Sequence, residues 1–515
     1  MQIVNTSFSD NARRSVRPLS WLLKMSFDKT FDSSINIFTL DHSLLDGPDL
    51  LAPTGDNPIQ LWDYYRYLEY TDRVQMVEWS REIEFPNSVS SAMADFVLNN
   101  YDNYFTPDSG SPIDSYILPK RPLRIFSGFN GDNIQQFVGL TEKMPIIDDS
   151  NRTVTFHALD FLSQMYTFPL VGTLAMAYVR TDEVLASIFQ QFGLLPAQYN
   201  LDRGRNEIRF VFFDKGAIAG DVFRQLMEAE MGNLWLDEQG IIRFTRRFKS
   251  LQVSSYTFNE SNTISIKTTG DEKIINKIKI FADLREIQDY QIVYTKAITS
   301  GDLFIVKAGE TNVFSADLQD PCITVVEPTI GTNSGVSWFT ASLPNGNNVP
   351  SGVTITDVEL RTNSYVITFS NSNGYDINIS SIELWGQPAK IVDKIEYTEV
   401  EQSSIDKYDE HIIEINNPFI QSIDQCDSIA IGVLDQFSDY AGEIEIEVKG
   451  HPALQLDDII SVSVKTYIGD YEIVKIKNRI QNSKYSQILT ARRYIPRHWF
   501  ILDSSLLDGT DVLSP

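Results

Sequence analysis

Apolar and polar residues alternate over much of the chain, a pattern that predicts half-buried β-strands. The segment SWLLKMSF places Leu23, Met25 and Phe27 on one side of an extended chain. The segment RPLRIFSGFNGDNIQQFVGL predicts two strands joined by a tight turn at Asn130-Gly131, and NRTVTFHALDFL predicts another strand. Strand signals return between about residues 250 and 420. The chain is therefore expected to be mainly β, with some helix.

One interruption of this pattern is expected to be helical. The segment NSVSSAMADFVLNN carries Val89, Met93, Phe96 and Val97 at helical spacing, and Ser88 is a suitable N-cap. A loop rich in proline, serine and glycine follows it. The first 175 residues are thus expected to form a β-barrel or sandwich that contains an α-helical insertion.

The following stretch, residues 176–250, predicts a compact α/β unit. A helix is expected in DEVLASIFQQF, with Thr181 as its N-cap and Gly193 just after its end. A buried strand FVFF, a second helix that ends at Gly232, and a hairpin that turns at Gln239-Gly240 follow.

The C-terminal third combines a helix with further strands. SIDQCDSIAIGVLDQF predicts a helix whose apolar stripe includes Ile423 and Cys426, so Cys426 is expected to be a core residue and not a reactive thiol. The strand EIEIEVK places Glu443, Glu445 and Glu447 on one face, opposite an apolar face.

Composition excludes several classes of function. The chain has 43 Lys and Arg residues and 69 Asp and Glu residues, which gives a net charge of -26. This negative charge opposes binding to the phosphate backbone of a nucleic acid. No apolar run is long enough to span a membrane. With only Cys322 and Cys426 present, a disulfide framework and a cysteine-rich zinc site are both excluded.

Motifs for catalysis are not found in the sequence. It has no phosphate-binding loop, dinucleotide fingerprint, nucleophile elbow or HExxH pair, and its five histidines are scattered singly. Two carboxylates suffice for a glycosidase, and four lie near one another in the chain: Glu228, Glu230, Asp237 and Glu238. A solvated helix face and a hairpin tip explain them better. We therefore expect no enzyme activity, no cofactor and no metal.

The aromatic run LWDYYRYLEY has two interpretations. Trp62, Tyr64, Tyr65, Tyr67 and Tyr70 could stack on a cell-wall sugar. We favour a strand that packs between two subunits.

An ordered series of segments resembles the central hub and tail-tip proteins of long-tailed bacteriophages and related injection machines. The main one is GHPALQLDDIISVSV, similar to a Gly-x-Pro-x-Leu-x-x-Gly-Asp-x-Ile/Val pattern of that family's second barrel. YEIVKIKNRI, YSQILTARR, RPLRIFSGF, VTFHALDFL, TDEVLASIFQQFGL and IINKIKIF add to the resemblance. Here Asp457 replaces the usual glycine of the pattern, so the turn must use a residue that enters left-handed conformations less easily.

This resemblance implies an architecture of two tube-like β-barrels per chain. The expected domains are a first barrel at 1–175 with an α-containing insertion at about 60–120, a small α/β unit at 176–250, a second barrel at 251–321 and 391–499, an inserted β-sandwich at 322–390, and a C-terminal docking tail at 500–515.

The same resemblance implies a homotrimer in the virion, at the distal end of the tail. It would close the tail tube, contact a tube or distal tail ring, a spike or fibre and a tape measure protein, and let DNA pass without specific binding. Glu443, Glu445 and Glu447 are then candidates for an acidic lumen. The alternative is a receptor-binding or cell-wall-degrading tail protein.

One apolar cassette occurs twice. FTLDHSLLDGPDLLAP begins at residue 38 and FILDSSLLDGTDVLSP ends the sequence. Each places a leucine pair beside an Asp-Gly turn, which predicts matched assembly clips centred on Leu44, Leu45, Asp46, Gly47 and on Leu506, Leu507, Asp508, Gly509. A chance strand-turn pattern is the plain alternative, and Ca²⁺ binding by Asp41, Asp46 and Asp49 is a weaker one.

Overall fold

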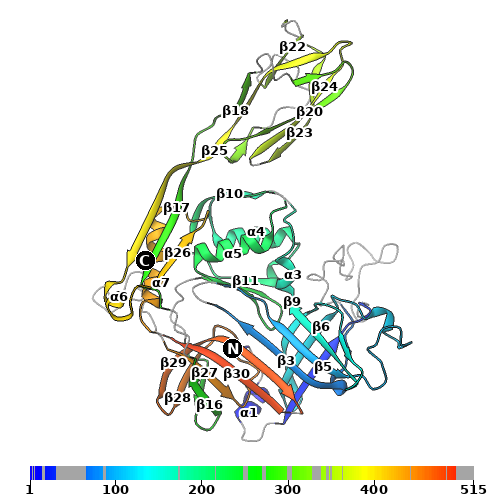
Figure 1. Cartoon of the computed structure of the whole chain (residues 1–515), viewed down its shortest axis with the longest axis vertical. Coiled ribbons are helices and arrows are strands. Elements are labelled where there is room, and N and C mark those ends of the chain that lie inside the picture. The colour runs from blue at the N-terminus through cyan, green and yellow to red at the C-terminus, as the bar shows by residue number, and fades with distance from the viewer. Residues whose placement is uncertain are drawn as a thin grey trace.

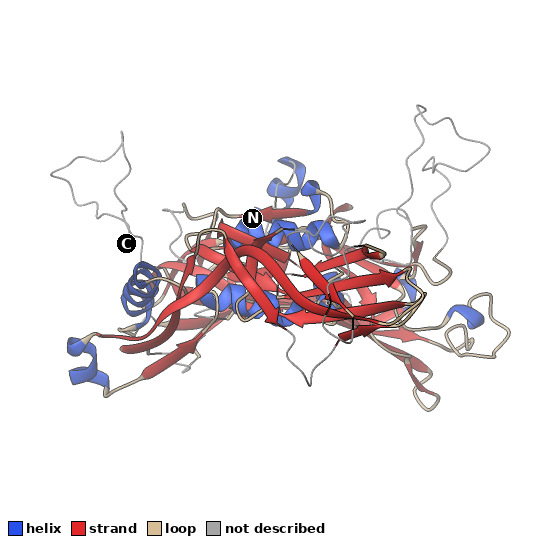
Figure 2. Cartoon of the chain, turned by 90° about the horizontal axis from the view of Figure 1, so that it is seen from above, coloured by secondary structure: helices blue, strands red, loops and turns tan. Residues whose placement is uncertain are grey.

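The computed structural model describes residues 1–2, 4, 6–13, 18–29, 65–84, 88–171, 174–214, 216–246, 253–269, 274–297, 304–326, 338–343, 347, 351–361, 363–440, 442–482 and 484–494. Figure 1 shows a broad body of strands at one end, a small α/β unit next to it, and a β-sandwich at the other end of a slender arm. Strands far outnumber helices (Figure 2), so the mainly β class is confirmed. Within the described residues, none of the helices has the length and apolar character needed to cross a membrane.

The body is built on a 14-stranded sheet. Its order is β16-β27-β30-β29-β3-β5-β9-β7-β6-β1-β2, with β28 beside β29, β15 beside β28, and β8 beside β9. The strands are β1 (Leu19–Met25), β2 (Leu68–Glu69), β3 (Val74–Glu82), β5 (Met93–Asn99), β6 (Pro122–Phe129), β7 (Asp132–Thr141), β8 (Ile146–Asp148), β9 (Thr153–Asp160), β15 (Tyr256–Asn259), β16 (Thr263–Thr268), β27 (Glu443–Val448), β28 (Ile459–Val464), β29 (Tyr467–Gln481) and β30 (Lys484–Arg493).

The N-terminal and C-terminal strands of this sheet meet at one seam. There β29 runs antiparallel to β3, from Lys475 opposite Glu82 to Gln481 opposite Met76. Two separate closed barrels were expected, but the described strands of each part do not close on themselves. The reason is that β3 and β29 satisfy their backbone groups by pairing with each other, which merges the two parts into one open sheet.

The helix expected at residues 88–97 is wrong. This stretch forms β4 (Ser88–Val89) and β5, and the described part of the supposed α-containing insertion holds strands and two short 3₁₀ turns, η1 (Thr71–Arg73) and η2 (Asp114–Tyr116). In β5 Phe96 and Leu98 are buried while Val97 faces outward. This alternation of buried and outward-facing side chains is typical of a β-strand. Pairing with β3 and β9 therefore outweighs the helical spacing of the apolar residues, which is coincidental.

Two tight turns follow from the local sequence. Asn130 and Gly131 adopt φ values of 56° and 91° between β6 and β7, so the predicted hairpin is confirmed. Asp457 adopts φ 73°, the left-handed conformation that the missing glycine would have adopted more easily. The turn is held there because the Asp457 backbone N–H donates to the Ile473 carbonyl over 2.9 Å.

The small α/β unit contains both helices expected from the sequence. Its elements are β10 (Leu174–Arg180), α4 (Thr181–Gln191), η3 (Pro196–Gln198), β11 (Tyr199–Leu201), β12 (Glu207–Phe213), α5 (Ala219–Glu230), β13 (Asn233–Leu236) and β14 (Ile242–Thr245). The hairpin at Gly240 is confirmed, and Gly193 has a φ of 75° as expected after α4. Thr181 is not the N-cap. Arg180 takes that place, and its backbone N–H donates to the Glu183 carboxylate over 2.8 Å.

A two-stranded arm carries the sandwich away from the body. It consists of β17 (Lys277–Ile287) and the 24-residue β25 (Ile377–Val400), paired antiparallel (Figure 1). In the sandwich β25 pairs with β18 (Gln291–Ala297), β19 (Phe304–Val306), β21 (Cys322–Val325) and β22 (Phe339–Ser342), and the second sheet holds β20 (Thr311–Asp317), β24 (Ser364–Asn371) and β23 (Val353–Arg361). The sandwich thus begins near residue 291, earlier than the expected boundary at 322, because the turn signals that set that boundary cluster only in its second half.

The foot of the arm packs on a helix. The helix α7 (Ile423–Phe437) contacts β17 and β25, and β26 (Ile412–Asn416) runs parallel to β17. Cys426 is fully buried there, which confirms its expected role, whereas Ile423 is 54% exposed and lies outside the stripe. The remaining helices are α1 (Thr6–Arg13), α3 (Phe161–Met165) and α6 (Gln402–Tyr408).

Candidate functional site

The solvent face of the large sheet carries the glutamates singled out from the sequence. Along β27 the apolar side chains are buried in the core, while Glu443, Glu445 and Glu447 lie half-buried on the opposite face. The predicted alternation of this strand is therefore confirmed.

Basic side chains border these glutamates on both sides. Lys267 on β16 lies opposite Glu445 and forms an ion pair of 2.8 Å with it. Arg492 on β30 lies opposite Glu443, and its guanidinium carbon lies 4.8 Å from the ring centre of Phe437 on α7. Burial lowers the pKa of Arg492, and the neighbouring carboxylates of Glu472 and Glu443 oppose that shift.

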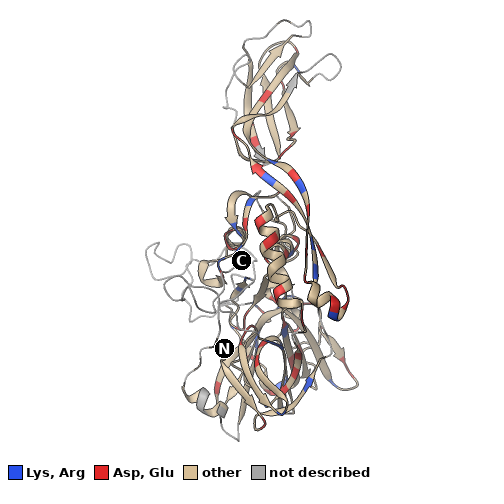
Figure 3. Ribbon diagram, turned by 90° about the vertical axis from the view of Figure 1, so that its left-hand side faces the viewer, with Lys and Arg blue, Asp and Glu red and all other residues tan. Residues whose placement is uncertain are grey.

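The same face continues across the seam between β29 and β3 as a row of cross-strand ion pairs. Lys477 pairs with Glu78 over 2.9 Å, and Lys475 pairs with Glu82. Figure 3 shows acidic and basic residues interleaved on the body and the arm. The surface around the three glutamates is therefore mixed in charge, and the chain's net acidity is not concentrated there.

A groove with a volume of about 710 Å³ opens on this face. Its walls are apolar at Ile83 and Val474 and aromatic at Phe437 and Tyr440, and the ion pairs described above form part of its rim. The sheet face thus offers a concave surface whose three lysines, Lys267, Lys475 and Lys477, are each paired with a glutamate.

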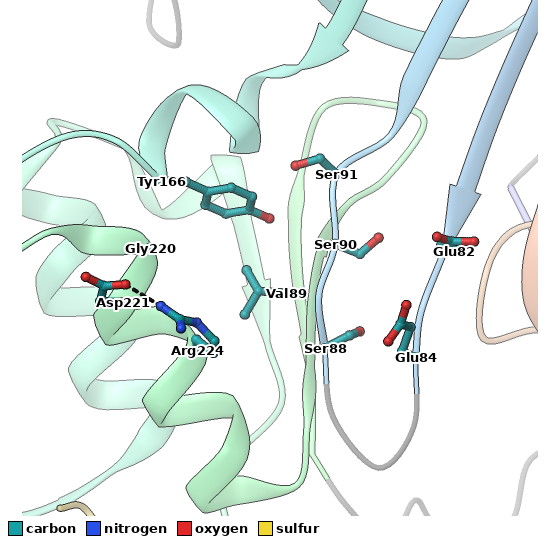
Figure 4. Close-up of a pocket in the computed structure, with 10 residues that line it drawn as sticks. All are labelled: Glu82, Glu84, Ser88, Val89, Ser90, Ser91, Tyr166, Gly220, Asp221 and Arg224. Carbon is teal, nitrogen blue, oxygen red and sulfur yellow. Dashed lines mark hydrogen bonds and ion pairs between the residues drawn. The ribbon is translucent and has the colours of Figure 1, made fainter. Parts of the chain in front are cut away.

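A second pocket, of about 580 Å³, lies between β4 and the helices α3 and α5 (Figure 4). The hydroxyls of Tyr166 and Ser91 point toward each other across it, and Asp221 and Arg224 on α5 form an ion pair. Glu82 and Glu84 line its other side, but Glu82 is 44% exposed and already paired with a lysine. The pocket does not present the buried carboxylic acid that a glycosidase uses as a proton donor.

The four carboxylates considered for glycosidase chemistry all have partners within the fold. Each is engaged by a different structural partner: Glu228 by Asn417, Glu230 by Thr181, Asp237 by Arg243 and Glu238 by Arg81. These contacts favour a structural role, but the solvated helix face and hairpin tip expected from the sequence are wrong, because Glu230, Asp237 and Glu238 are all buried.

A buried ion pair joins three parts of the chain behind the seam. Arg81 points inward from β3, and its Nη1 donates to Glu238 Oε1 over 2.7 Å, with the two side chains only 6% and 4% exposed. Gln455 Nε2, near β28, donates to the other carboxylate oxygen over 2.6 Å, and Gln135 Nε2 on β7 donates to the Glu238 carbonyl over 2.9 Å. Burial raises the pKa of Glu238, and Arg81 counteracts this.

Sequence reasoning missed this joint, although a signal exists. In β3 the inward positions are Val77, Trp79 and Arg81, so a charged residue occupies an otherwise apolar register. A charged residue in such a position needs a buried partner. That partner, Glu238, lies 157 residues away in the hairpin of the α/β unit, and the fold brings the two together.

Other predicted residues lie partly or wholly outside the described part of the chain. Both cassettes, with Leu44, Leu45, Asp46, Gly47, Leu506, Leu507, Asp508 and Gly509, fall there, as do Asp41 and Asp49. Of the aromatic run, Trp62 and Tyr64 also fall outside. Tyr70 packs in the core of its own chain, 5.6 Å from the rings of Phe27 and Phe105, and not between subunits as expected.

The described histidines occupy structural positions. His157 contacts Asp95 on the neighbouring strand, and His451 is buried with its ring 4.4 Å from that of Tyr256. In the described ranges no group of three or more His, Cys, Asp or Glu side chains is arranged to hold a metal ion.

Comparison with solved structures finds tail proteins. The 43 kDa tail protein of prophage MuSo2 from Shewanella oneidensis is 9% identical, with a TM-score of 0.44 over 83% of this chain and 95% of that one. The prophage tail protein gp18 from Listeria monocytogenes is 11% identical, with a TM-score of 0.39 over 84% and 93%. A type VI secretion component of E. coli is 8% identical, with a TM-score of 0.38 over 83% and 78%.

No family model and no curated protein sequence matches the chain. The three TM-scores all lie below 0.5.

Proposed function

We propose that this protein is the structural hub of a bacteriophage tail tip, which closes the tail tube, joins it to a spike, fibre or plug, and guides DNA out. The observation that carries the proposal is the seam, where an N-terminal and a C-terminal set of strands continue as one sheet through β3 and β29. One chain thereby supplies two adjoining wall segments. The hub-like motifs occur in both, in RPLRIFSGF on the first and in GHPALQLDDIISVSV on the second.

A homotrimer follows from this arrangement. Two wall segments per chain, repeated around a threefold axis, give six segments and can match a hexameric tube. The face with Glu443, Glu445 and Glu447 is our candidate for the lumen, because it is a continuous, polar and grooved surface.

The charge of this face fits the passage of DNA. Lys267, Lys475 and Lys477 are all held by carboxylates, so the face has no continuous basic track that would bind phosphates. Close ion pairs also reduce long-range repulsion. We therefore propose a wall that neither binds nor strongly repels DNA. Its lumen would be less acidic than the net charge of the chain alone led us to expect.

The repeated cassettes are proposed as assembly clips. Leucine pairs beside an Asp-Gly turn would expose apolar area in an isolated chain, and two similar cassettes could dock on the two quasi-equivalent wall segments of neighbouring copies or of an adjoining ring. Other tail proteins are therefore expected partners.

Native mass measurement combined with a cell-wall hydrolysis screen tests the proposal. A mass three times that of the chain, without release of sugar from peptidoglycan, supports a hub. A monomer that hydrolyses cell wall, with activity lost on changing a described carboxylate, would favour the alternative of a cell-wall-degrading tail protein.

A further inference from the structure

The groove on the solvent face of the sheet lies next to the point where the described part of the chain ends. Arg493, the last residue of β30, donates its backbone N–H to the Gly442 carbonyl over 3.0 Å, and Gly442 lines the groove. The N–H of the next residue, Tyr494, donates to the Asp470 carbonyl over 2.8 Å. Residues 495–515 follow in the sequence. They are therefore tethered to the rim of the groove.

The walls of the groove favour an occupant with apolar and aromatic side chains. Tyr440 lines it and is 42% exposed, and Ile274 and Ile488 also line it and are only half-buried. Apolar side chains that remain accessible within a concave surface are typical of a docking site.

The charges of the groove favour an occupant that is positively charged. Its lysines are all paired with glutamates. Glu84, which follows β3, is exposed and forms no ion pair with another described residue. The remaining cation, Arg492, is influenced by two carboxylates, Glu472 and Glu443, so its charge does not fully neutralise Glu443. A cationic segment complements this surface, whereas an acidic segment does not.

The first part of the tethered segment has this composition. Residues 495–502 read IPRHWFIL, which places Arg497 and His498 among apolar residues and includes no Asp or Glu, although the chain has a net charge of -26. Residues 503–515, in contrast, carry three aspartates and no basic residue. The match in charge and apolar character is thus confined to residues 495–502.

Residues 495–502 are long enough to cross the groove. The groove is lined by residues of β27, β30 and β29 and by the end of β3, which are successive neighbours in the sheet. Three strand spacings amount to about 14 Å. Eight extended residues span about 26 Å, so a segment that begins beside Gly442 reaches the far wall.

We propose that residues 495–502, the anchor segment, dock in the groove of their own chain, with Arg497 beside Glu443 and Trp499 against the aromatic wall. The docked segment fills the groove on the sheet face and leaves the cassette core at residues 505–515 free to engage other subunits. This inference does not require the proposed hub function, because every contact that it uses lies within one chain.

Binding of a peptide to the full-length protein tests the docking. The probe is a fluorescent peptide with the sequence of residues 495–502. The variant Arg497→Ser/Trp499→Ser/Phe500→Ser should empty the groove and bind the peptide with a Kd below about 0.1 mM, because a tethered segment with an effective concentration of about 1 mM must exceed its Kd to stay docked. The unmodified protein should bind the peptide at least about tenfold more weakly, since its own segment competes.

The matched control changes the cassette instead of the anchor segment. Leu506→Ser/Leu507→Ser should bind the peptide as weakly as the unmodified protein does. If the emptied variant does not bind the peptide, or if all three proteins bind it equally, the docking is overturned.

A change in the groove identifies where the peptide binds. In the emptied variant, Tyr440→Ala should weaken peptide binding at least about fivefold, because it removes an accessible aromatic wall. Tyr290→Ala removes a tyrosine that is 53% exposed and does not line the groove, and should leave the affinity unchanged. Equal effects of the two changes would contradict binding in the groove.

Photo-cross-linking of the full-length protein needs no emptied groove. A photoreactive benzoylphenylalanine in place of Trp499 should cross-link, at nanomolar protein concentration, to residues 437–445 or 474–492 of the same chain. Cross-links that lie elsewhere, or that join two copies and increase with protein concentration, would overturn docking within one chain. Both experiments use the isolated protein, so their failure leaves the trimeric hub untouched, and a monomeric mass leaves the docking untouched.

Discussion

Replacing Arg81 by methionine should destabilise the chain strongly. Arg81 and Glu238 lie 2.7 Å apart, and their side chains are 6% and 4% exposed, so Arg81→Met leaves a buried carboxylate without its counter-charge. Breaking such a pair from one side costs about 3–5 kcal/mol. Burial already raises the pKa of Glu238, so the variant should take up a proton there, and its stability should fall as the pH rises through the new pKa.

The matched control lies on the same strand seam but on the solvent face. Lys477 and Glu78 are 2.9 Å apart with side chains 44% and 25% exposed, so Lys477→Met should cost less than about 1 kcal/mol. The double variant Arg81→Met/Glu238→Leu removes both buried charges and should recover most of the loss.

The assay is urea unfolding combined with hydrogen exchange of the hairpin at residues 233–245. The exchange readout locates the loss at the joint and does not require the whole chain to unfold in one step. Arg81→Met should lower the protection of this hairpin, and Lys477→Met should not. If the two single variants have equal and small effects, the buried pair does not hold the three parts together.

Two further changes test the turn and the cassettes. Asp457→Gly should stabilise the chain by about 0.5–1 kcal/mol, because glycine adopts the φ of 73° without strain. The control Ser463→Gly, within β28, should destabilise the chain by a similar amount. If thermal unfolding shows that both variants raise, or both lower, the melting temperature, this explanation of the turn is refuted. Deleting residues 505–515 should leave the melting temperature nearly unchanged but impair particle assembly, and normal assembly and infectivity after the deletion would rule out the clip.

Local patterns account for much of the fold. The hairpins at Asn130 and Gly240, the helices of the α/β unit and the alternation in β27 were all predictable, because turn residues and periodicity act over a few neighbours. The error at residues 88–97 shows the limit of this reasoning. The apolar residues in this stretch fit both the spacing of a helix and the alternation of a strand. Pairing with the neighbouring strands β3 and β9 decides for the strand.

The joint and the seam could not be read from periodicity. Arg81 stood out as a charge in an apolar register, but its partner Glu238 lies 157 residues away. The merging of two expected barrels into one sheet likewise depends on β3 meeting β29, almost 400 residues later in the chain. Such long-range pairing is set by tertiary packing, of which the local sequence carries no record.

Image averaging of the assembled particle by electron microscopy tests the central claim most directly. The proposal predicts three copies of this chain around a threefold axis at the distal end of the tail tube, with the face of β27, β30, β29 and β3 directed toward the axis. A particle in which the chain is absent from the tail, or in which single copies extend outward as fibres, would contradict it.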